Sequence, residues 1–206
     1  MRAWLAGILV LGVTAWSGAA HALLVDFRTS AFASADQQAS FSTSAGGVDL
    51  TFTPLPTPNA RLYWDSTDGF GVRYAYEADE IEGAETLLIQ FSSQVWLQEI
   101  QLTDLFNESG YLEIGYYELD GSGAPVQFIA DPAQGPGTNG VRSLEVGSFV
   151  TSIAFTAPGR TNGQNHEFSV SGLRFEARQP VPEPASTALF GAGIAAVAFA
   201  LRRQLR

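Results

Sequence analysis

Carboxylates are concentrated in one short stretch of the chain, between residues 65 and 85. The segments 65–69 and 79–83 both have the composition of loops, and each ends in a glycine that permits a sharp turn. Calcium takes about six to eight oxygen ligands, which two such loops brought together would supply. The sequence therefore predicts a structural calcium site, with a solvated acidic face as the alternative. The predicted ligands are Asp65, Asp68, Asp79, Glu80 and Glu82.

The same acids are the best candidates for catalysis. A retaining glycosidase needs two carboxyl groups about 5 Å apart, and Glu80 and Glu82 would share one face of a strand. The third alternate position is Ala84, so a row of three acids is missing. His166 lies among Asn, Gln and Gly residues and is expected to be solvated. We therefore predict a body without enzymatic activity, and a polysaccharide-active enzyme is the alternative.

The charge balance restricts the partners of the chain. Its formal net charge is −10, and 20 of its 21 acids lie between residues 23 and 180. An acidic body is repelled by nucleic-acid phosphate and by anionic lipid, so nucleic acid is not an expected partner. Cysteine is absent, which excludes disulfides and thiol chemistry.

The first 22 residues have the pattern of a signal peptide. Arg2 gives a positive start, residues 3–16 are apolar, and Ala20-His21-Ala22 matches the small-residue pattern of a cleavage site. We expect signal peptidase to remove residues 1–22.

Residues 23–178 are expected to form one β-sandwich domain of jelly-roll or lectin-like type. Short segments of alternating hydrophobicity recur about every 8–12 residues, and no amphipathic helix interrupts them. Residues 28–38 are expected to be a loop, residues 92–94 a hairpin connection, and Pro54 the end of a strand. In the strand at 111–119 we expect Leu112, Ile114 and Tyr116 to share the apolar face. The predicted strands are 23–27, 48–52, 61–65, 85–91, 95–102, 111–119, 126–130, 141–146, 152–156 and 168–175.

Aromatic residues are abundant enough to fill a wide core, with 14 Phe, six Tyr and four Trp. Adjacent aromatic residues on a strand face opposite sides, so some should point outward and stack on sugars. Packing in the core is the alternative for each of them. The candidates are Tyr63, Trp64, Tyr74, Tyr76, Trp96, Tyr116 and Tyr117.

The last residues of the chain have three parts in a fixed order. Val181-Pro182-Glu183-Pro184 is proline-rich and therefore extended, and residues 185–201 carry no charge. As a helix these 17 residues would span about 26 Å, the short end of what crosses a membrane. By the positive-inside bias the arginines that follow should stay cytoplasmic, with the body outside. These arginines are Arg202, Arg203 and Arg206.

This tail resembles the PEP-CTERM sorting signal, although the resemblance covers only residues 181–206. It implies that residues 179–206 are a substrate of exosortase, a membrane-embedded processing enzyme of Gram-negative bacteria that make exopolysaccharide and biofilm. Pro182, Glu183 and Pro184 would be the recognised residues. The resemblance implies an exported precursor, held in the inner membrane and then delivered to the envelope, surface or exterior.

A second, weaker resemblance lies in the body. The segment 68–72, Asp-Gly-Phe-Gly-Val, precedes an Asp-Glu-Ile turn at 79–81 and an apolar strand at 87–91. Many PEP-CTERM proteins have a similar order, which implies no known activity. Together these patterns predict a binding or structural module that contacts extracellular polysaccharide.

Overall fold

The computed structural model describes residues 22–74, 79–83, 85–108, 110–135, 137–160 and 164–178. The predicted signal peptide, apart from Ala22, and the predicted sorting segment at 179–206 lie outside these residues. Within the described ranges, no helix is long and apolar enough to cross a membrane. The predicted span at 185–201 is not among them.

The described strands form one sheet of eleven strands and a separate two-stranded ribbon. The main path through the sheet runs β11-β10-β12-β7-β13-β5-β4, while β8 pairs with β9 to form the ribbon. A short 3-10 helix, η1 (Ser30–Ala35), follows the first strand. The strands are β1 (Leu23–Asp26), β2 (Phe41–Ala45), β3 (Val48–Leu55), β4 (Arg61–Asp65), β5 (Gly69–Arg73), β6 (Ile81–Glu82), β7 (Thr86–Thr103), β8 (Asn107–Glu108), β9 (Tyr111–Leu112), β10 (Ile114–Leu119), β11 (Val126–Ile129), β12 (Arg142–Thr156) and β13 (Glu167–Ala177).

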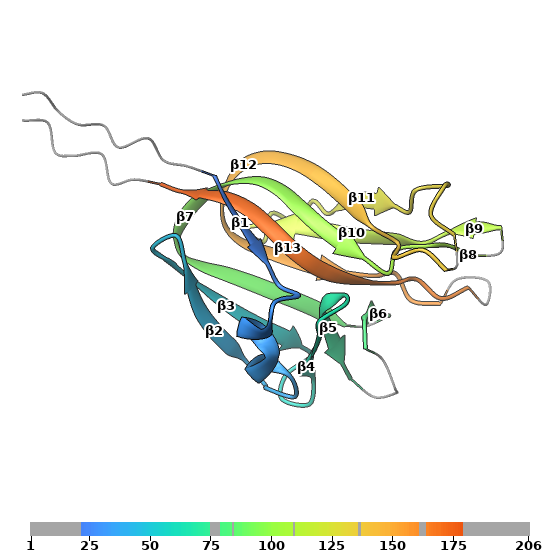
Figure 1. Ribbon diagram of the computed structural model, residues 1–206, viewed down its shortest axis with the longest axis horizontal. Coiled ribbons are helices and arrows are strands. Elements are labelled where there is room, and N and C mark those ends of the chain that lie inside the picture. Colours follow the sequence, from blue (N-terminus) through green and yellow to red (C-terminus); the bar gives the residue numbers. More distant parts are fainter. Residues whose placement is uncertain are drawn as a thin grey trace, which may run out of the picture.

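The sheet curls because its longest strand changes partners along its length. Residues 86–91 of β7 pair with β3, whereas residues 95–103 pair with β13. Strand β12 accompanies β7 on its other side through both halves. In Figure 1 the sheet folds over, with β2 to β5 below and β10 to β13 above. The predicted all-β class is confirmed; the predicted sandwich is not, because hydrogen bonds join the main strands into one sheet.

Several predicted boundaries were wrong. Residues 92–94 continue β7 instead of making a hairpin, and β12 joins the two strands predicted at 141–146 and 152–156. Strand β12 absorbs the extra residues through register shifts, one between Glu145 and Ser148. Strand β3 extends through Pro54, beyond the point where β2 ends opposite Phe52. There β3 has a partner on one side only, so the missing proline N–H is tolerated.

The predicted inner face of β10 was also wrong. Glu113, Gly115 and Tyr117 are buried, and the side predicted to be apolar is only partly buried. The cause is a close approach of two rings: a Cβ at Gly115 would lie 2.3 Å from the Phe128 ring and 2.6 Å from the Phe168 ring. Glycine therefore makes room for an aromatic pair that the alternation of the strand does not reveal.

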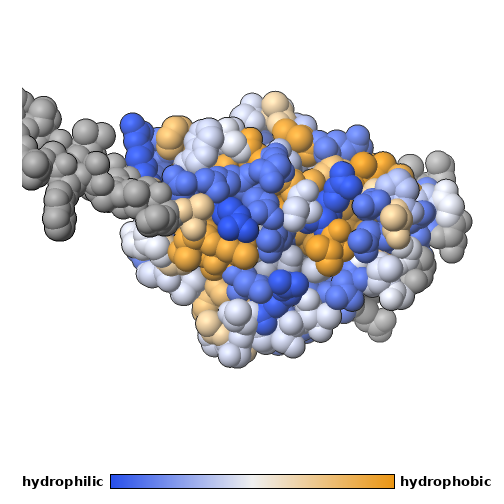
Figure 2. Space-filling model, turned by 45° about the horizontal axis from the view of Figure 1, so that its top comes forward, coloured by the Kyte–Doolittle hydropathy of each residue, from blue (hydrophilic) through white to orange (hydrophobic). Residues whose placement is uncertain are grey.

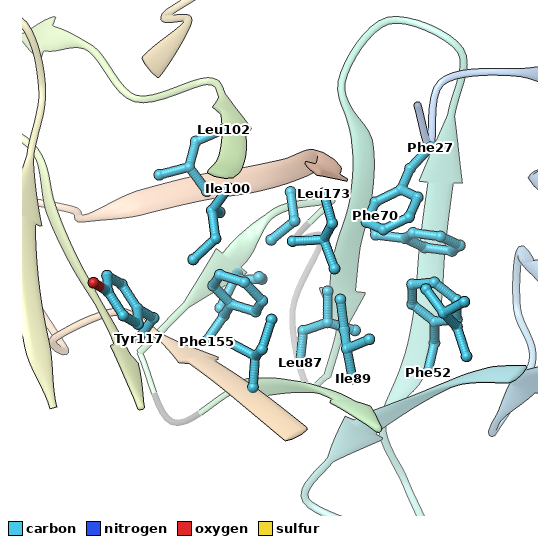
Figure 3. Packing of buried hydrophobic residues seen from close by; sticks show 14 of the residues in the cluster. Phe27, Phe52, Phe70, Leu87, Ile89, Ile100, Leu102, Tyr117, Phe155 and Leu173 are labelled. Carbon is cyan, nitrogen blue, oxygen red and sulfur yellow. The ribbon is translucent and has the colours of Figure 1, made fainter. Parts of the chain in front are cut away.

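Aromatic rings fill the inside of the curl, as the composition predicted. Phe27 packs edge-on against Phe52 at 5.2 Å, and Phe52 lies 4.6 Å from Phe70. Figure 3 shows these rings beside the aliphatic side chains of β7 and β13. The segment predicted as loop at 28–38 contains η1, which buries Phe32 against the same rings. The core therefore depends on long-range aromatic contacts that hold the curl closed.

Candidate functional site

The Asp-Gly-Phe-Gly-Val segment and the acidic turn that follows it form one packing unit. A Cβ at Gly71 would lie 1.9 Å from the Asp79 carbonyl oxygen and 2.8 Å from the Glu80 Cα. A Cβ at Gly69 would lie 2.5 Å from the Val170 carbonyl oxygen, and its φ of +96° favours glycine. The two glycines let β5 lie directly against β13 and against the backbone of the acidic turn. These close approaches explain why positions 69 and 71 are both glycine.

The sheet brings further acids to this turn. Glu82 is paired with Glu167 at the start of β13, and Asp104 follows the end of β7. We call this group of carboxyl groups the acidic end. It consists of Asp65, Asp68, Asp79, Glu80, Glu82, Asp104, Glu113 and Glu167.

Asp68 and Asp104 form a carboxyl pair within the acidic end. The two carboxyl groups are close enough to influence each other's pKa. Burial, with the charge of Asp68 next to it, raises the pKa of Asp104 to about 7. Burial also raises the pKa of Asp68, while Arg28 opposes the rise. The pair therefore keeps a proton at a pH where exposed carboxyl groups have lost theirs.

Glu80 is the most perturbed of the predicted ligands. Burial first, and then the charges of Glu167 and Asp104, raise its pKa to about 9. Its backbone carbonyl accepts a hydrogen bond from the Val72 N–H at 3.3 Å, which holds the turn on β5. Glu82 instead accepts a hydrogen bond from the Asn165 side chain at 2.8 Å. The two predicted catalytic carboxyls thus have different environments and partners.

Glu113 and His166 connect the acidic end to β10. The Glu113 carboxylate is 1% exposed and accepts a hydrogen bond from the Phe106 N–H at 2.6 Å. Burial raises its pKa to about 8. His166 is 6% exposed, and its Nδ1 accepts a hydrogen bond from the Ile114 N–H at 3.3 Å. The prediction of a solvated histidine was therefore wrong, because its ring is neutral and buried beside Tyr111.

A metal site is not apparent among these carboxyls. In the described part of the chain, no three His, Asp or Glu side chains are arranged to hold a metal ion. Burial and the neighbouring charges raise the pKa of Glu80, Asp104 and Glu113 and so favour their neutral forms. The predicted calcium site stays a prediction, which requires the carboxyl groups to rearrange around the ion.

A different set of side chains gathers near the other end of β13. Trp96 and Phe149 lie opposite each other on β7 and β12, with ring centroids 4.8 Å apart, and Phe149 is 51% exposed. The Arg178 guanidinium lies 5.7 Å from the Phe149 ring centroid and donates a hydrogen bond to the Gln94 side chain at 2.5 Å. We call this group the aromatic platform. It consists of Gln94, Trp96, Gln98, Phe149, Glu176 and Arg178.

Three long strands contribute neighbouring positions to the platform. Glu176 on β13 is opposite Trp96, and its carboxylate accepts a hydrogen bond from Gln98 at 2.7 Å. On β12, Gly147 sits in the register shift next to Trp96, and no side chain there covers the indole. Next to the platform, Arg174 pairs with Glu99 at 2.9 Å and lowers the pKa of that carboxyl. The platform therefore offers ring surface and planar polar groups side by side.

The other predicted sugar-stacking residues are engaged elsewhere. The Trp64 indole donates a hydrogen bond to the Phe27 carbonyl oxygen at 2.6 Å, and Tyr117 is 8% exposed. Arg73 lies over the Tyr63 ring at 4.8 Å. Tyr116 and Tyr74 are half-buried, and Tyr76 lies outside the described residues. Trp96 is half-buried as well, and it differs from the other predicted residues in its contact with the exposed Phe149 ring.

Sequence reasoning missed Phe149, although a signal was present. Phe149 and Val150 are adjacent apolar residues in a strand, so one of them must face outward. It also missed the convergence of Asp104, Glu113 and Glu167, which lie next to the ends of β7, β10 and β13 and come together only in the folded sheet.

Comparison with known proteins identifies the tail. Residues 180–204 match the PEP-CTERM protein-sorting motif, as the resemblance predicted, and the match includes Pro182, Glu183 and Pro184. The motif implies an exported, envelope-associated protein that exosortase processes. No curated protein and no solved structure matches the chain.

Proposed function

We propose that the body is a non-catalytic binding module that contacts extracellular polysaccharide through the aromatic platform. The observation that carries the proposal is the exposed Phe149 ring packed against the half-buried Trp96, flanked by amide, carboxylate and guanidinium groups. Ring surfaces pack against the apolar faces of sugars, and planar polar groups donate to and accept from sugar hydroxyls. The sorting motif supports the proposal because it directs the chain to the compartment where such polymers lie.

Binding to the host's own exopolysaccharide tests the proposal. Purified protein should be retarded in a gel that contains the polymer, and Trp96→Ala should weaken binding by about tenfold or more, the loss of about 1.4 kcal/mol. Val141→Ala is the matched control, because Val141 is another exposed apolar residue outside the platform, 44% exposed. Equal retardation of Trp96→Ala and the parent would contradict the proposal.

The alternative function is a polysaccharide-active enzyme at the acidic end. Its supporting observation is the pKa of Glu80, which burial raises to about 9, since a carboxyl that stays protonated near neutral pH suits a general acid. Incubation with the polymer would then release reducing ends, and Glu80→Gln or Glu82→Gln would abolish the release. We favour binding because Glu80 and Glu82 have different partners and the row of three acids on one strand face is missing.

The tail is proposed to act as a temporary membrane anchor that exosortase removes. Its prolines keep the recognised residues extended, and the arginines hold the apolar segment in place until it is cut. Replacing Pro182, Glu183 and Pro184 by alanine should leave the unprocessed precursor in the inner membrane of the host. Pulse-labelling followed by fractionation measures this, and unchanged release of the variant would reject the proposed role of the three residues.

A further inference from the structure

Both described ends of the body lie at the same end of the sheet. Strands β1 and β13 are antiparallel, with Leu23 opposite Phe175. This is also the end of β13 that carries Glu176 of the platform, as its position in Figure 1 shows. The matched sorting motif begins at residue 180, two residues after Arg178. The tail therefore leaves the body beside the aromatic platform.

The surface at this end mixes apolar, aromatic and cationic groups. Leu23 and Leu24 are 37% and 39% exposed, and Phe149 is 51% exposed. Figure 2 shows an apolar area on the body next to the point where the chain ends depart. Aromatic rings and arginine side chains are the groups that favour the interface between lipid and water. The composition of this end fits a lipid headgroup layer.

The charge distribution favours the same orientation. The acidic end is separated from the platform by nine residues of β13, from Glu167 to Glu176, or about 30 Å of strand. An anionic lipid surface repels that distant end most strongly. Near the platform, Glu99 is paired with Arg174, and the Glu176 carboxylate is hydrogen-bonded to Gln98. The body is therefore polarised along its length.

The tether is too short to let the body turn freely. Six residues lie between Arg178 and Ala185, where the uncharged segment begins, so seven Cα–Cα steps join the two. Fully extended, they span at most about 25 Å. Their prolines also stiffen the tether. An inserted tail thus keeps this end of the body close to the bilayer.

Leu24 lies opposite Arg174 and therefore shares the outer face of the sheet with the platform, whereas Leu23 lies opposite the buried Phe175. We propose that, while the tail is in the membrane, the surface formed by Leu24, Trp96, Phe149 and Arg178 rests on the lipid headgroups. The partner is the lipid surface itself. The inference rests on the proposed anchoring of the tail. It also implies that the access of polysaccharide to the proposed glycan site is regulated. The platform is covered in the anchored precursor and becomes available to polysaccharide when processing frees the body.

Quenching of tryptophan fluorescence by brominated lipid tests the contact. The chain from Leu23 onward, which lacks Trp4 and Trp16 of the predicted signal peptide and keeps the tail, is reconstituted into vesicles of phosphatidylcholine and phosphatidylglycerol, with and without bromine on the acyl chains near the headgroups. We expect brominated lipid to quench part of the emission of the parent, and Trp96→Phe to remove most of that part. Trp64→Phe is the matched control, because the Trp64 indole is hydrogen-bonded to Phe27 inside the body, and it should leave the quenched part unchanged.

The possible outcomes distinguish a failure of this inference from a failure of the proposed anchoring or of the proposed glycan binding. Vesicles that float with the chain but show equal quenching in the parent and in Trp96→Phe would overturn the lipid contact alone. A chain that does not float with vesicles would overturn the anchoring and the contact together. Polysaccharide binding at equal strength by the anchored chain and by the chain freed of its tail would overturn the covering of the platform and leave glycan binding intact.

Discussion

The two ends of β13 use their polar groups in opposite ways. At the acidic end, half-buried and buried carboxyls lie close to one another, and burial raises the pKa of Glu80 to about 9 and of Glu113 to about 8. At the platform, about 30 Å along the strand, polar groups surround the half-buried Trp96 and the exposed Phe149. The part of the sequence richest in chemically reactive residues thus serves packing. The surface best suited to a partner contains few such residues.

The largest expected effect comes from filling the space above β5. Gly71→Ala would place a Cβ 1.9 Å from the Asp79 carbonyl oxygen, so the acidic turn must move away from the sheet. We expect a loss of about 3 kcal/mol in the free energy of unfolding, measured with denaturant. Gly159→Ala is the control, because a Cβ there meets nothing within 4 Å. Equal stability of the two variants would show that the turn is not packed on β5.

The enclosed carboxyls predict that stability falls as the pH rises. The pKa of Glu113 is about 8 in the folded protein, above the ordinary value near 4.5. Its stabilising effect is complete below pH ~4.5 and is lost as the pH rises towards 8. Glu113→Gln keeps an acceptor for the Phe106 N–H and removes the titration. The variant should therefore be about 1 to 2 kcal/mol more stable than the parent at pH 9, with no gain at pH 4.

Denaturant unfolding at pH 4, 6 and 9 gives this comparison directly. The exposed Glu145, on the opposite side of β12 from the core, supplies the control Glu145→Gln. Parallel stability curves for the parent and Glu113→Gln across this range would contradict the account of the acidic end.

Calcium should stabilise the acidic end if the predicted site forms. Divalent ions would replace the protons, so the effect should be larger at pH 8 than at pH 5. We expect the melting temperature of chelated protein to rise by a few degrees on adding calcium at about 100 times its dissociation constant, and less so in Asp68→Asn. No shift at either pH would remove the calcium prediction.

The smallest effect on stability is expected at the platform. Phe149 is half-exposed, so Phe149→Ala removes little buried surface and should change the free energy of unfolding by less than about 1 kcal/mol. The same substitution should weaken polysaccharide binding. A loss of several kcal/mol of stability would mean that the Trp96 and Phe149 pair is part of the packing of the protein.

The sequence predicts features that depend on neighbouring residues better than features that depend on contacts between residues distant in the chain. Alternation correctly placed Leu87, Ile89 and Phe91 on one buried face. The prediction of the inner face of β10 failed because rings from β11 and β13 approach the strand at Gly115 and make that side the buried one. Glu113 escaped notice for the same reason, since an acid flanked by apolar residues gives no local sign that a distant N–H will hold it.

The tail was predictable because its information is local. Order, spacing and charge of residues 180–204 are sufficient for its recognition, without any tertiary contact. The platform needed three strands in register, and its local signals were the candidate Trp96 and the neighbouring apolar residues Phe149 and Val150. The acidic stretch was noticed first, yet the acids that perturb Glu80 most, Glu167 and Asp104, come from other strands.

Affinity for the host's exopolysaccharide, measured side by side in Trp96→Ala and Glu80→Gln, tests the contrast between the two ends most directly. The account predicts at least about a tenfold weaker affinity in Trp96→Ala and an unchanged affinity in Glu80→Gln. The opposite result, with binding lost in Glu80→Gln and kept in Trp96→Ala, would place the working surface at the acidic end and contradict the account.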